Sequence, residues 1–303
     1  MGLKVLIIGY GSIGRKHANL LRKLKSVSSI YILTKQKCKK FKKLNSLKDV
    51  KIINPDYIII SSRSNLHYKY LNYLDKIIKN KIILVEKPLF HKNFNLKIKN
   101  NKVFVGYNLR FHPVINFIKR YIKNKNIFLS NITCKSYLPN WRKNRSYMKS
   151  NSAKKSYGGG VLLELSHEID YINWMFDGIK KIDHAKISKI SNLKIDTEDY
   201  AFIEGKSLRS YFNLELNFFS KLEERKIAIY GKNFSIIGDL INNKITISDE
   251  NRNKKILNYN LEKNYTYIKE HRSILSNDKK IACSYKEGKK IMFIIDKIRK
   301  FNK

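Results

Sequence analysis

A glycine-rich turn between an apolar run and a helical repeat is the feature of this sequence that most restricts its fold. Residues 4–8 are apolar and β-branched, and Gly9-Tyr10-Gly11-Ser12-Ile13-Gly14 follows directly with the spacing G-x-G-x-x-G. In a dinucleotide-binding turn the first glycine permits the bend, the second lets a pyrophosphate approach the backbone, and the third packs helix on strand. The context therefore predicts a dinucleotide site at Gly9, Gly11, Ser12, Ile13 and Gly14, the alternative being a βα turn without a ligand.

Apolar runs recur through the first third of the chain, at residues 30–33, 57–61, 81–86 and 102–106, with helical stretches between them. Continuous apolar strands that alternate with helices are typical of a buried parallel sheet. After about residue 125, strand-like segments joined by short turns predict an antiparallel sheet instead, with helices near 161–176 and 286–301. We therefore predict an α/β protein with a doubly wound Rossmann sheet in residues 1–120 and an α+β domain in residues 121–303.

The end of the second predicted strand indicates which dinucleotide is bound. NAD enzymes usually place Asp or Glu there to accept the ribose 2′-hydroxyl. This chain has Leu33-Thr34-Lys35-Gln36-Lys37, with no carboxylate and with a hydroxyl and two ammonium groups that suit a 2′-phosphate. NADP(H) is the predicted cofactor, with NAD(H) possible and with Thr34 and Lys35 as binding residues.

The chain is strongly basic, with 63 Lys and Arg against 24 Asp and Glu in 303 residues and a formal net charge of +39. Residues 1–150 hold 34 of the basic and only 4 of the acidic residues, and there is no acidic residue between Glu86 and Glu164. Such charge suits nucleic acid, a membrane surface or an anionic small molecule. Since 51 residues are Lys and only 6 are Ala, part of the excess is compositional background.

Composition excludes several other classes of protein. A hydrophobic content of 43% argues against disorder, and the apolar runs are far shorter than the ~20 residues of a membrane span. The start of the chain has no signal-peptide pattern. Three scattered cysteines form neither a disulfide framework nor a zinc pattern, so a soluble cytoplasmic protein is expected.

Three further segments carry a family resemblance. They are Glu86-Lys87-Pro88-Leu89, the run Gly106-Tyr107-Asn108-Leu109-Arg110-Phe111-His112-Pro113, and the segment from Gly158-Gly159-Gly160 to Glu164 and His167-Glu168-Ile169-Asp170. With the glycine turn and His17, they make the chain resemble the Gfo/Idh/MocA family of NAD(P)-dependent sugar dehydrogenases over nearly its full length. The resemblance implies a C-terminal domain with an open, mostly antiparallel sheet.

The resemblance also implies roles for residues of the first domain. Lys87 is expected beside the nicotinamide, in contact with the hydroxyl that is oxidised, as a catalytic and binding residue. Glu86 and the loop that contains Ser61 and His67 are expected near the cofactor. Tyr107 is expected at the substrate, and Arg110 at cofactor or substrate.

His167 is the second candidate for proton exchange, because imidazole titrates near neutral pH. Family members usually carry Asp four residues before this His, but Leu163 stands there and the nearest carboxylate is Glu164, three residues before. Positions i and i+3 share a helical face, so Glu164 is expected to orient His167 or bind a substrate hydroxyl. Asp170 is expected to hold the helix, and no metal site is expected because thiolate or second-His partners are missing.

The predicted function is hydride transfer between nicotinamide and a carbinol or keto carbon of a sugar derivative. The acid-free span contains Arg110, Arg142, Lys143 and Arg145, which favours an anionic substrate such as a nucleotide sugar or a sugar acid. A role in surface-glycan synthesis and assembly as a homo-dimer or homo-tetramer are further hypotheses. The alternatives are reduction of an imine or a linear tetrapyrrole, a cofactor-binding protein without turnover, and nucleic-acid binding, which no motif supports.

Overall fold

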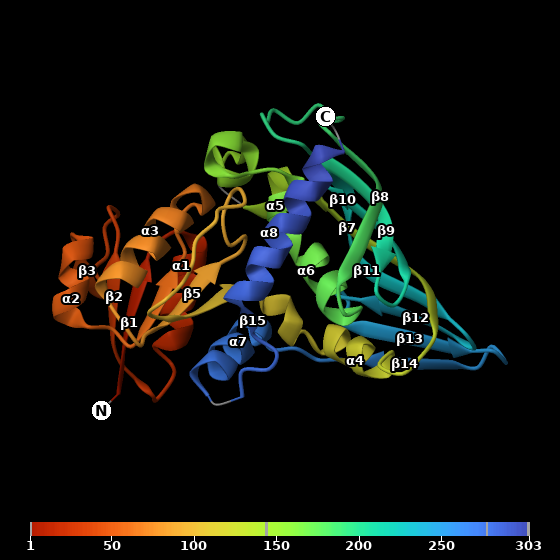
Figure 1. Cartoon of the computed structure of the whole chain (residues 1–303), viewed down its shortest axis with the longest axis horizontal. Coiled ribbons are helices and arrows are strands. Elements are labelled where there is room, and N and C mark those ends of the chain that lie inside the picture. The colour runs from red at the N-terminus through yellow and green to blue at the C-terminus, as the bar shows by residue number, and fades with distance from the viewer. Residues whose placement is uncertain (1, 143–144, 277, 302–303) are drawn as a thin grey trace. The chain divides into compact units, whose positions relative to one another are not determined.

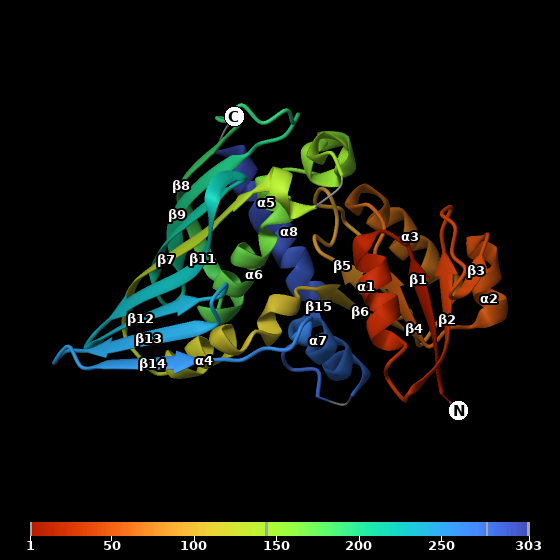
Figure 2. The same ribbon diagram turned by 180° about the vertical axis from the view of Figure 1, so that it is seen from behind.

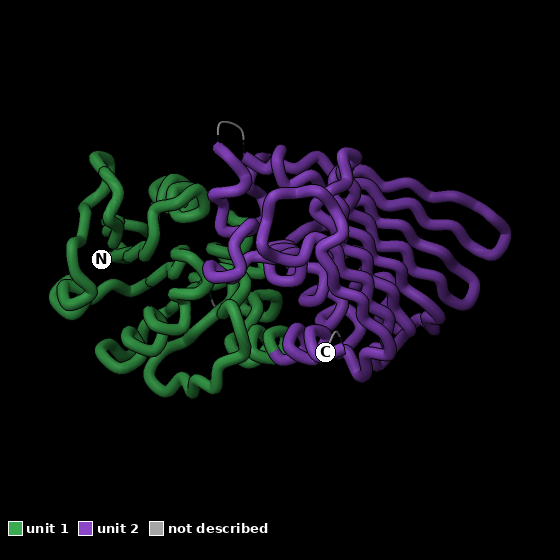
Figure 3. The backbone as a smooth tube through the Cα atoms, turned by 90° about the horizontal axis from the view of Figure 1, so that it is seen from above, with its two compact units in different colours: residues 1–107, 267–292 green, residues 108–266, 293–303 purple. Residues whose placement is uncertain are grey.

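The computed structural model describes residues 2–142, 145–276 and 278–301, so Lys143 of the acid-free span lies outside the described residues. The chain divides into two compact units, shown in green and purple in Figure 3. Unit 1 comprises Met1–Tyr107 and Tyr267–Met292, and unit 2 comprises Asn108–Thr266 and Phe293–Lys303. The units therefore differ from two contiguous domains divided at residue 120, because a late segment of the chain returns to the first unit.

The sheet of unit 1 has the strand order of a doubly wound nucleotide-binding fold (Figure 1). Its order is β15-β6-β5-β4-β1-β2-β3, and the pairs from β6 to β3 are parallel. The order reverses between β1 and β4, which is where such sheets bind ligands at the carboxyl ends of their strands. The strands are β1 (Leu3–Ile8), β2 (Val27–Leu33), β3 (Lys42–Leu44), β4 (Tyr57–Ile60), β5 (Ile82–Glu86), β6 (Lys102–Gly106) and β15 (Cys283–Ser284).

Helix α1 (Ser12–Leu21) follows β1 directly and packs on it. Helix α3 (Ser64–Ile77) follows β4 and packs on β4 and β5, and α2 (Val50–Ile53) is a single turn. The returning segment adds the antiparallel β15 to the edge of β6 and contains most of α7 (Tyr265–Leu275). It also contains the start of α8 (Tyr285–Lys300), where a Cβ at Gly288 would collide with Val105 of β6. This close packing makes the segment part of the first core.

The sheet of unit 2 is open and mostly antiparallel, as expected (Figure 2). Its order is β14-β13-β12-β11-β7-β10-β9-β8, and only the β7–β10 pair is parallel among the described strands. The strands are β7 (Ile127–Tyr137), β8 (Ile179–Ser188), β9 (Tyr200–Ser207), β10 (Tyr211–Asn217), β11 (Phe219–Gly231), β12 (Phe234–Asp239), β13 (Lys244–Asp249) and β14 (Lys254–Asn258).

One face of this sheet is covered by helices. Helix α4 (Pro113–Tyr121) packs on β12, where Gly238 makes room for it, and α5 (Val161–Glu164) packs on β9 and β10. Helix α6 (Ser166–Met175) follows α5 after a break at Leu165, so the single helix predicted for residues 161–176 is two helices. No helix within the described residues is long and apolar enough to cross a membrane.

Four aromatic residues of unit 2, Tyr211, Phe212, Phe218 and Phe219, divide between the two sides of the sheet. Tyr211 is exposed, and Phe219 is half-buried. Phe212 and Phe218 are buried in the core, since adjacent residues of a strand point to opposite faces. Only Tyr211 and Phe219 of this set could therefore take part in an assembly through the open face.

Candidate functional site

The glycine turn has the geometry that a dinucleotide requires. Gly9 has a φ of +99°, and Gly14 lies so close to Gly9 that a Cβ would run into the Gly9 carbonyl oxygen. A Cβ built on Gly11 would meet no atom within 4 Å, so open space faces this residue. Helix α1 starts at Ser12 with Gly11 as its N-cap, with no side-chain cap and no acidic residue in its first turn. Backbone N–H groups at such a helix start suit an anion, and the turn therefore fits the pyrophosphate of a dinucleotide.

Arg15, one turn into α1, lies at the end of β2. Its Nη2 donates to Gln36 Oε1 at 3.1 Å, its Nε donates to the Tyr10 carbonyl at 3.2 Å, and its guanidinium lies 4.8 Å from the centre of the Tyr10 ring. Thr34 Oγ1 accepts the Gln36 N–H at 3.1 Å, and Lys35 is exposed. The structure thus adds a guanidinium to the Thr34 and Lys35 predicted for a 2′-phosphate.

Lys87 follows β5 and is half-buried, with its backbone fixed from two directions. The Lys87 N–H donates to Glu86 Oε2 at 3.2 Å, and the Lys87–Pro88 peptide bond is cis. Glu86 is buried, and its Oε1 lies 2.8 Å from Nε2 of His17. On the paired strand β6, a Cβ at Gly106 would lie 3.1 Å from this oxygen, so glycine leaves room for the carboxylate.

Glu86 is the end of a buried chain of four side chains. His17 Nδ1 lies 2.9 Å from His271 Nε2, and His271 Nδ1 lies 3.0 Å from the Tyr57 hydroxyl. Burial, with His17 beside it, holds the pKa of His271 well below its usual value, and burial with the nearby Glu270 raises the pKa of Tyr57. One proton arrangement satisfies every contact: Tyr57 donates to His271, His271 to His17, and His17 to Glu86. No motif points to His271, which lies 254 residues from its partner His17.

Ser61 and His67 connect backbone segments around the turn. Ser61 Oγ donates to the Gly9 carbonyl at 3.0 Å. The buried His67 has Nδ1 at 3.0 Å from the Pro88 carbonyl and Nε2 at 3.1 Å from the Ser62 carbonyl, and burial lowers its pKa. These contacts hold the loop after β4 and the segment after Lys87 in place, while direct contact of either side chain with a cofactor stays a prediction.

In unit 2, the ionisable side chains of α5 and α6 differ in how far they are buried. Glu164 and His167 are half-buried, whereas Glu168 and Asp170 are buried. Both oxygens of Glu168 accept from Arg225, at 2.7 and 3.0 Å. Because Glu164 ends α5 and His167 is the second residue of α6, the shared helical face expected for them is interrupted at Leu165. Glu164 and His167 remain the polar side chains of this segment that solvent can still reach.

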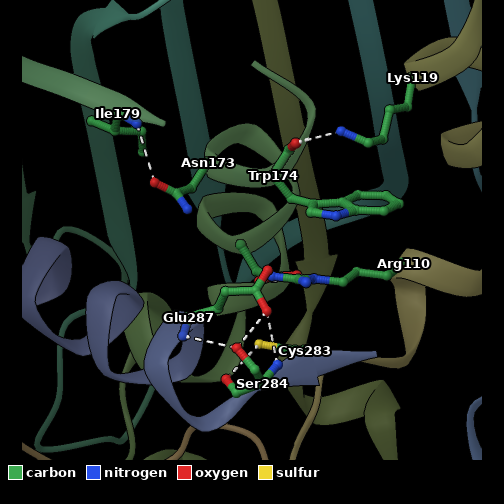
Figure 4. Close-up of polar contacts among 9 residues, drawn as sticks. Arg110, Lys119, Asn173, Trp174, Ile179, Cys283, Ser284 and Glu287 are labelled. Carbon is green, nitrogen blue, oxygen red and sulfur yellow. Dashed lines mark hydrogen bonds and ion pairs between the residues drawn. The ribbon is translucent and has the colours of Figure 1, made fainter. Parts of the chain in front are cut away.

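Arg110 lies in a buried ion pair, and its expected contact with cofactor or substrate stays a prediction. Its side chain is 1% exposed, and its Nη2 and Nε donate to Asp170 at 2.7 and 2.9 Å. The Arg110 guanidinium also lies 5.3 Å from the centre of the Trp174 ring. The backbone carbonyl of Trp174 accepts a hydrogen bond from Lys119 Nζ at 2.7 Å (Figure 4). Asp170 thereby holds α6, as expected. Tyr107, expected at the substrate, is buried at the end of β6.

Two further contacts fix the ends of this helical segment. Asn173 Oδ1 accepts the N–H of Ile179, where β8 begins, at 3.1 Å (Figure 4). At the other end, the Glu198 carboxylate lies against Gly160, where a Cβ would collide with it, and burial raises its pKa. The sequence motifs did not identify Glu198 as a residue that holds this segment. The run Asp196-Thr197-Glu198-Asp199, which stands out in an acid-poor chain, could have pointed to it. Among the described residues, no group of three or more His, Cys, Asp and Glu is placed to hold a metal ion.

Comparisons with known proteins agree with this geometry. Residues 3–97 match the model of the GFO_IDH_MocA oxidoreductase family, NAD-binding Rossmann fold. No curated protein matches the chain by sequence. Among solved structures, levoglucosan dehydrogenase in complex with NADH has a TM-score of 0.85 at 16% identity, over 99% of this chain and 97% of that chain.

Two nucleotide-sugar enzymes have similar folds. UDP-N-acetylglucosamine 3-dehydrogenase GnnA from Acidithiobacillus ferrooxidans has a TM-score of 0.78 at 13% identity, over 99% of this chain and 98% of that chain. The WlbA dehydrogenase from Bordetella pertussis in complex with NADH and UDP-GlcNAcA has a TM-score of 0.77 at 14% identity, over 99% and 96%. The matched segment contains the glycine turn and β1 to β5, so this part of unit 1 is similar to the NAD-binding Rossmann fold of the Gfo/Idh/MocA oxidoreductase family.

Proposed function

We propose that this protein is an NAD(P)-dependent dehydrogenase that transfers a hydride between nicotinamide and a carbinol or keto carbon of a sugar derivative. The observation that carries the proposal is the turn at Gly9, Gly11 and Gly14, with open space at Gly11 and the uncapped start of α1. When bound, the nicotinamide cofactor accepts or supplies the hydride. The protein binds and orients the reactants and moves the hydroxyl proton.

Lys87 and His167 are proposed to exchange that proton. The backbone of Lys87 is fixed through Glu86, and the adjacent Pro88 carbonyl is fixed through His67, so the origin of the Lys87 side chain is set by buried contacts. His167 is half-buried at the start of α6, a helix anchored through Glu168 and Asp170. Glu164 is proposed to orient His167 or to bind a substrate hydroxyl. A rigid origin with an accessible end is what general acid–base groups need.

NADP(H) is the proposed preference, with NAD(H) as the less favoured cofactor. Arg15, Thr34 and Lys35 gather at the end of β2, where the chain has no carboxylate for a ribose 2′-hydroxyl. A cluster of cations and a hydroxyl at this place suits a 2′-phosphate. Replacing Lys35 by Asp should weaken NADPH binding and strengthen NADH binding in fluorescence titrations. An unchanged preference would contradict the assignment.

An anionic sugar, either a nucleotide sugar or a sugar acid, is the proposed substrate class. Two proteins of similar fold carry nucleotide-sugar names, and the span from Glu86 to Glu164 has no acidic residue between its ends. Surface-glycan synthesis is the proposed setting. A cytoplasmic location is proposed as well, and none of the three cysteines forms a disulfide. Assembly as a homo-dimer or homo-tetramer is proposed through the open sheet face, which exposes Tyr211 and Tyr230.

Variants of the two proton-exchange residues test the proposal. Wild type, Lys87→Met and His167→Ala are compared for NADPH oxidation across a panel of keto-sugars, nucleotide-linked keto-sugars and imines. Each variant should lose about 100-fold or more in kcat, because general acid–base catalysis contributes on this scale. Lys79→Met, an exposed lysine elsewhere in unit 1, is the matched control. Full activity in both site variants would refute the mechanism, and turnover of imines alone would refute the substrate class.

A further inference from the structure

A cavity of about 260 Å³ lies within unit 2, among the short helical turns that follow β7. It is lined by residues of η3 (Leu138–Trp141), η4 (Tyr147–Lys149) and η5 (Asn151–Ala153) and by Arg142, Arg145, Ser146 and Ser150. Its volume is slightly below the roughly 300–1,000 Å³ typical of sites that hold a whole ligand. The cavity is therefore of a size for one part of a larger molecule.

The charged residues that line this cavity are all cations. They are Arg142, Arg145 and Lys149, and each is exposed. Within the described part of the chain, none of the three forms an ion pair. The described lining of the cavity contains no acidic residue beside these three cations. Arginine forks suit phosphate oxygens, which they bind in pairs.

Aromatic rings supply the other part of the lining, and the indole of Trp141 is held in a defined orientation. Its Nε1 donates to Ser136 Oγ at 3.1 Å, and its ring lies nearly perpendicular to the Phe218 ring at a centroid distance of 5.1 Å. The Tyr147 hydroxyl accepts the Lys194 N–H at 3.2 Å. Aromatic rings at such a site offer faces on which a nucleobase can stack, with about 1–3 kcal/mol for each stacked base.

The inner wall of the cavity contains a polar group that a ligand would satisfy. Ser150 Oγ is buried and has no hydrogen-bond partner among the described residues. A buried hydroxyl without a partner is uncommon in folded proteins and calls for an occupant such as a ligand or an ordered water. The Ser150 hydroxyl is therefore evidence, separate from the three cations, that the cavity binds a polar group.

The cavity wall is also bonded to the segment that leads into the helices of Glu164 and His167. The Ser152 carbonyl accepts the Gly160 N–H at 3.1 Å, and the Thr197 hydroxyl donates to the same oxygen at 3.3 Å. A Cβ on Gly159 would lie about 2.5 Å from the carbonyl oxygens of Asn151 and Ser152, so the two segments are in direct contact. Occupancy of the cavity is thereby linked to the segment from which α5 and α6 begin.

We propose that this cavity binds the nucleoside diphosphate group of the substrate. The diphosphate contacts Arg142, Arg145 and Lys149, the base stacks on Trp141, and Ser150 contacts a polar atom of the bound group. The proposal rests on the proposed function, since it selects nucleotide sugars from the two anionic substrate classes considered there. A sugar acid would present one carboxylate, for which three cations and a stacking ring are more than the chemistry requires.

Calorimetric titration with uridine diphosphate tests this assignment without turnover. The protein is first saturated with NADP⁺, so that uridine diphosphate cannot occupy the dinucleotide turn of unit 1. The expected result is binding of one uridine diphosphate per chain, with uridine and inorganic pyrophosphate each binding more weakly. In R142M/R145M the affinity for uridine diphosphate should fall about 10- to 100-fold, because hydrogen bonds to charged groups are lost. Trp141→Leu should weaken uridine but leave pyrophosphate unchanged.

K254M/K255M is the matched control, since it removes two exposed cations from β14 of the same unit. Equal affinities in wild type and R142M/R145M would overturn the proposal. Equal losses in R142M/R145M and K254M/K255M would also overturn it, because they indicate general charge attraction. Tighter binding of glucuronate than of uridine diphosphate is a third overturning result.

The result can be separated from the fate of the proposed function. Binding of uridine diphosphate at this cavity without turnover of any nucleotide sugar would support the site and refute the dehydrogenase. Turnover of unsubstituted sugars, with a KM that R142M/R145M leaves unchanged, would support the dehydrogenase and refute the site.

Discussion

Replacing Gly11 by Ala separates cofactor binding from folding more cleanly than any other change in the glycine turn. Gly11 has φ −74° and ψ −166°, which alanine adopts without strain, and its Cβ would meet no protein atom within 4 Å. The same substitution at Gly14 would drive a Cβ into the Gly9 carbonyl and to 2.8 Å from Ser61 Oγ. Only the Gly11 variant therefore keeps the fold while placing a methyl group where a pyrophosphate is expected.

The expected magnitudes follow from these contacts. Alanine is a poorer N-cap than glycine, which costs about 0.5–1 kcal/mol, and the loss of a flexible glycine from the unfolded chain offsets about 0.4–1 kcal/mol. The free energy of unfolding of Gly11→Ala should thus stay within about 1 kcal/mol of wild type. Loss of one charge-assisted hydrogen bond to the pyrophosphate is worth about 1.5–3 kcal/mol, so Kd for NADPH should rise about 10- to 150-fold.

Two measurements on the same protein check both expectations. Urea unfolding gives the stability, and NADPH fluorescence gives Kd. Asn19→Ala, on the exposed side of α1, is the control and should change neither quantity by much. A Gly11→Ala protein of normal stability that binds NADPH as tightly as wild type would refute the placement of the pyrophosphate at this turn.

Three further changes test the buried contacts by urea unfolding. Tyr57→Phe leaves Nδ1 of His271 without its donor and should lower the free energy of unfolding by about 1–3 kcal/mol, whereas an unchanged stability would refute the proton arrangement. Asp170→Asn leaves the Arg110 guanidinium buried without its counter-charge and should cost about 3–5 kcal/mol, with an effect below 1 kcal/mol arguing against a packing role. Burial lowers the pKa of His112 to about 4, so as the pH falls below about 6.5 the unfolded chain binds this proton before the folded protein does. Wild type should therefore lose about 3 kcal/mol of its free energy of unfolding through His112 between pH 6.5 and 4, and His112→Asn should not show this loss. Identical pH profiles of stability for wild type and His112→Asn would contradict the expectation.

Local periodicity predicted the strands well, because each strand is a run that its own residues define. β6 spans Lys102–Gly106, as predicted. The return of residues 267–292 to unit 1 could not be predicted in this way. β15 has only two residues, and its identity as a strand depends on the edge of β6, about 180 residues earlier in the chain.

The candidate site shows the same division. The spacing of Gly9, Gly11 and Gly14 predicted their geometry, since each glycine acts through its own backbone. The resemblance implies a ligand contact for Arg110, but it does not reveal the carboxylate partner of Arg110, Asp170, which lies 60 residues further along the chain. A side chain's role depends on its partner, and sequence spacing does not reveal partners that only the tertiary fold brings together.

Acidic residues are more informative than basic ones in this chain. No Lys is fully buried among the described residues, whereas six acidic residues are, namely Asp75, Glu86, Glu168, Asp170, Asp199 and Glu270. Acidic side chains are rarely buried unless they are paired, and the contacts of the first five of these residues fix a loop, a strand end or a helix. Exposed Lys side chains do not need a protein partner in this way, so the net charge of +39 says little by itself about what the protein binds. Cations become informative where they surround a cavity without acidic partners, as Arg142, Arg145 and Lys149 do.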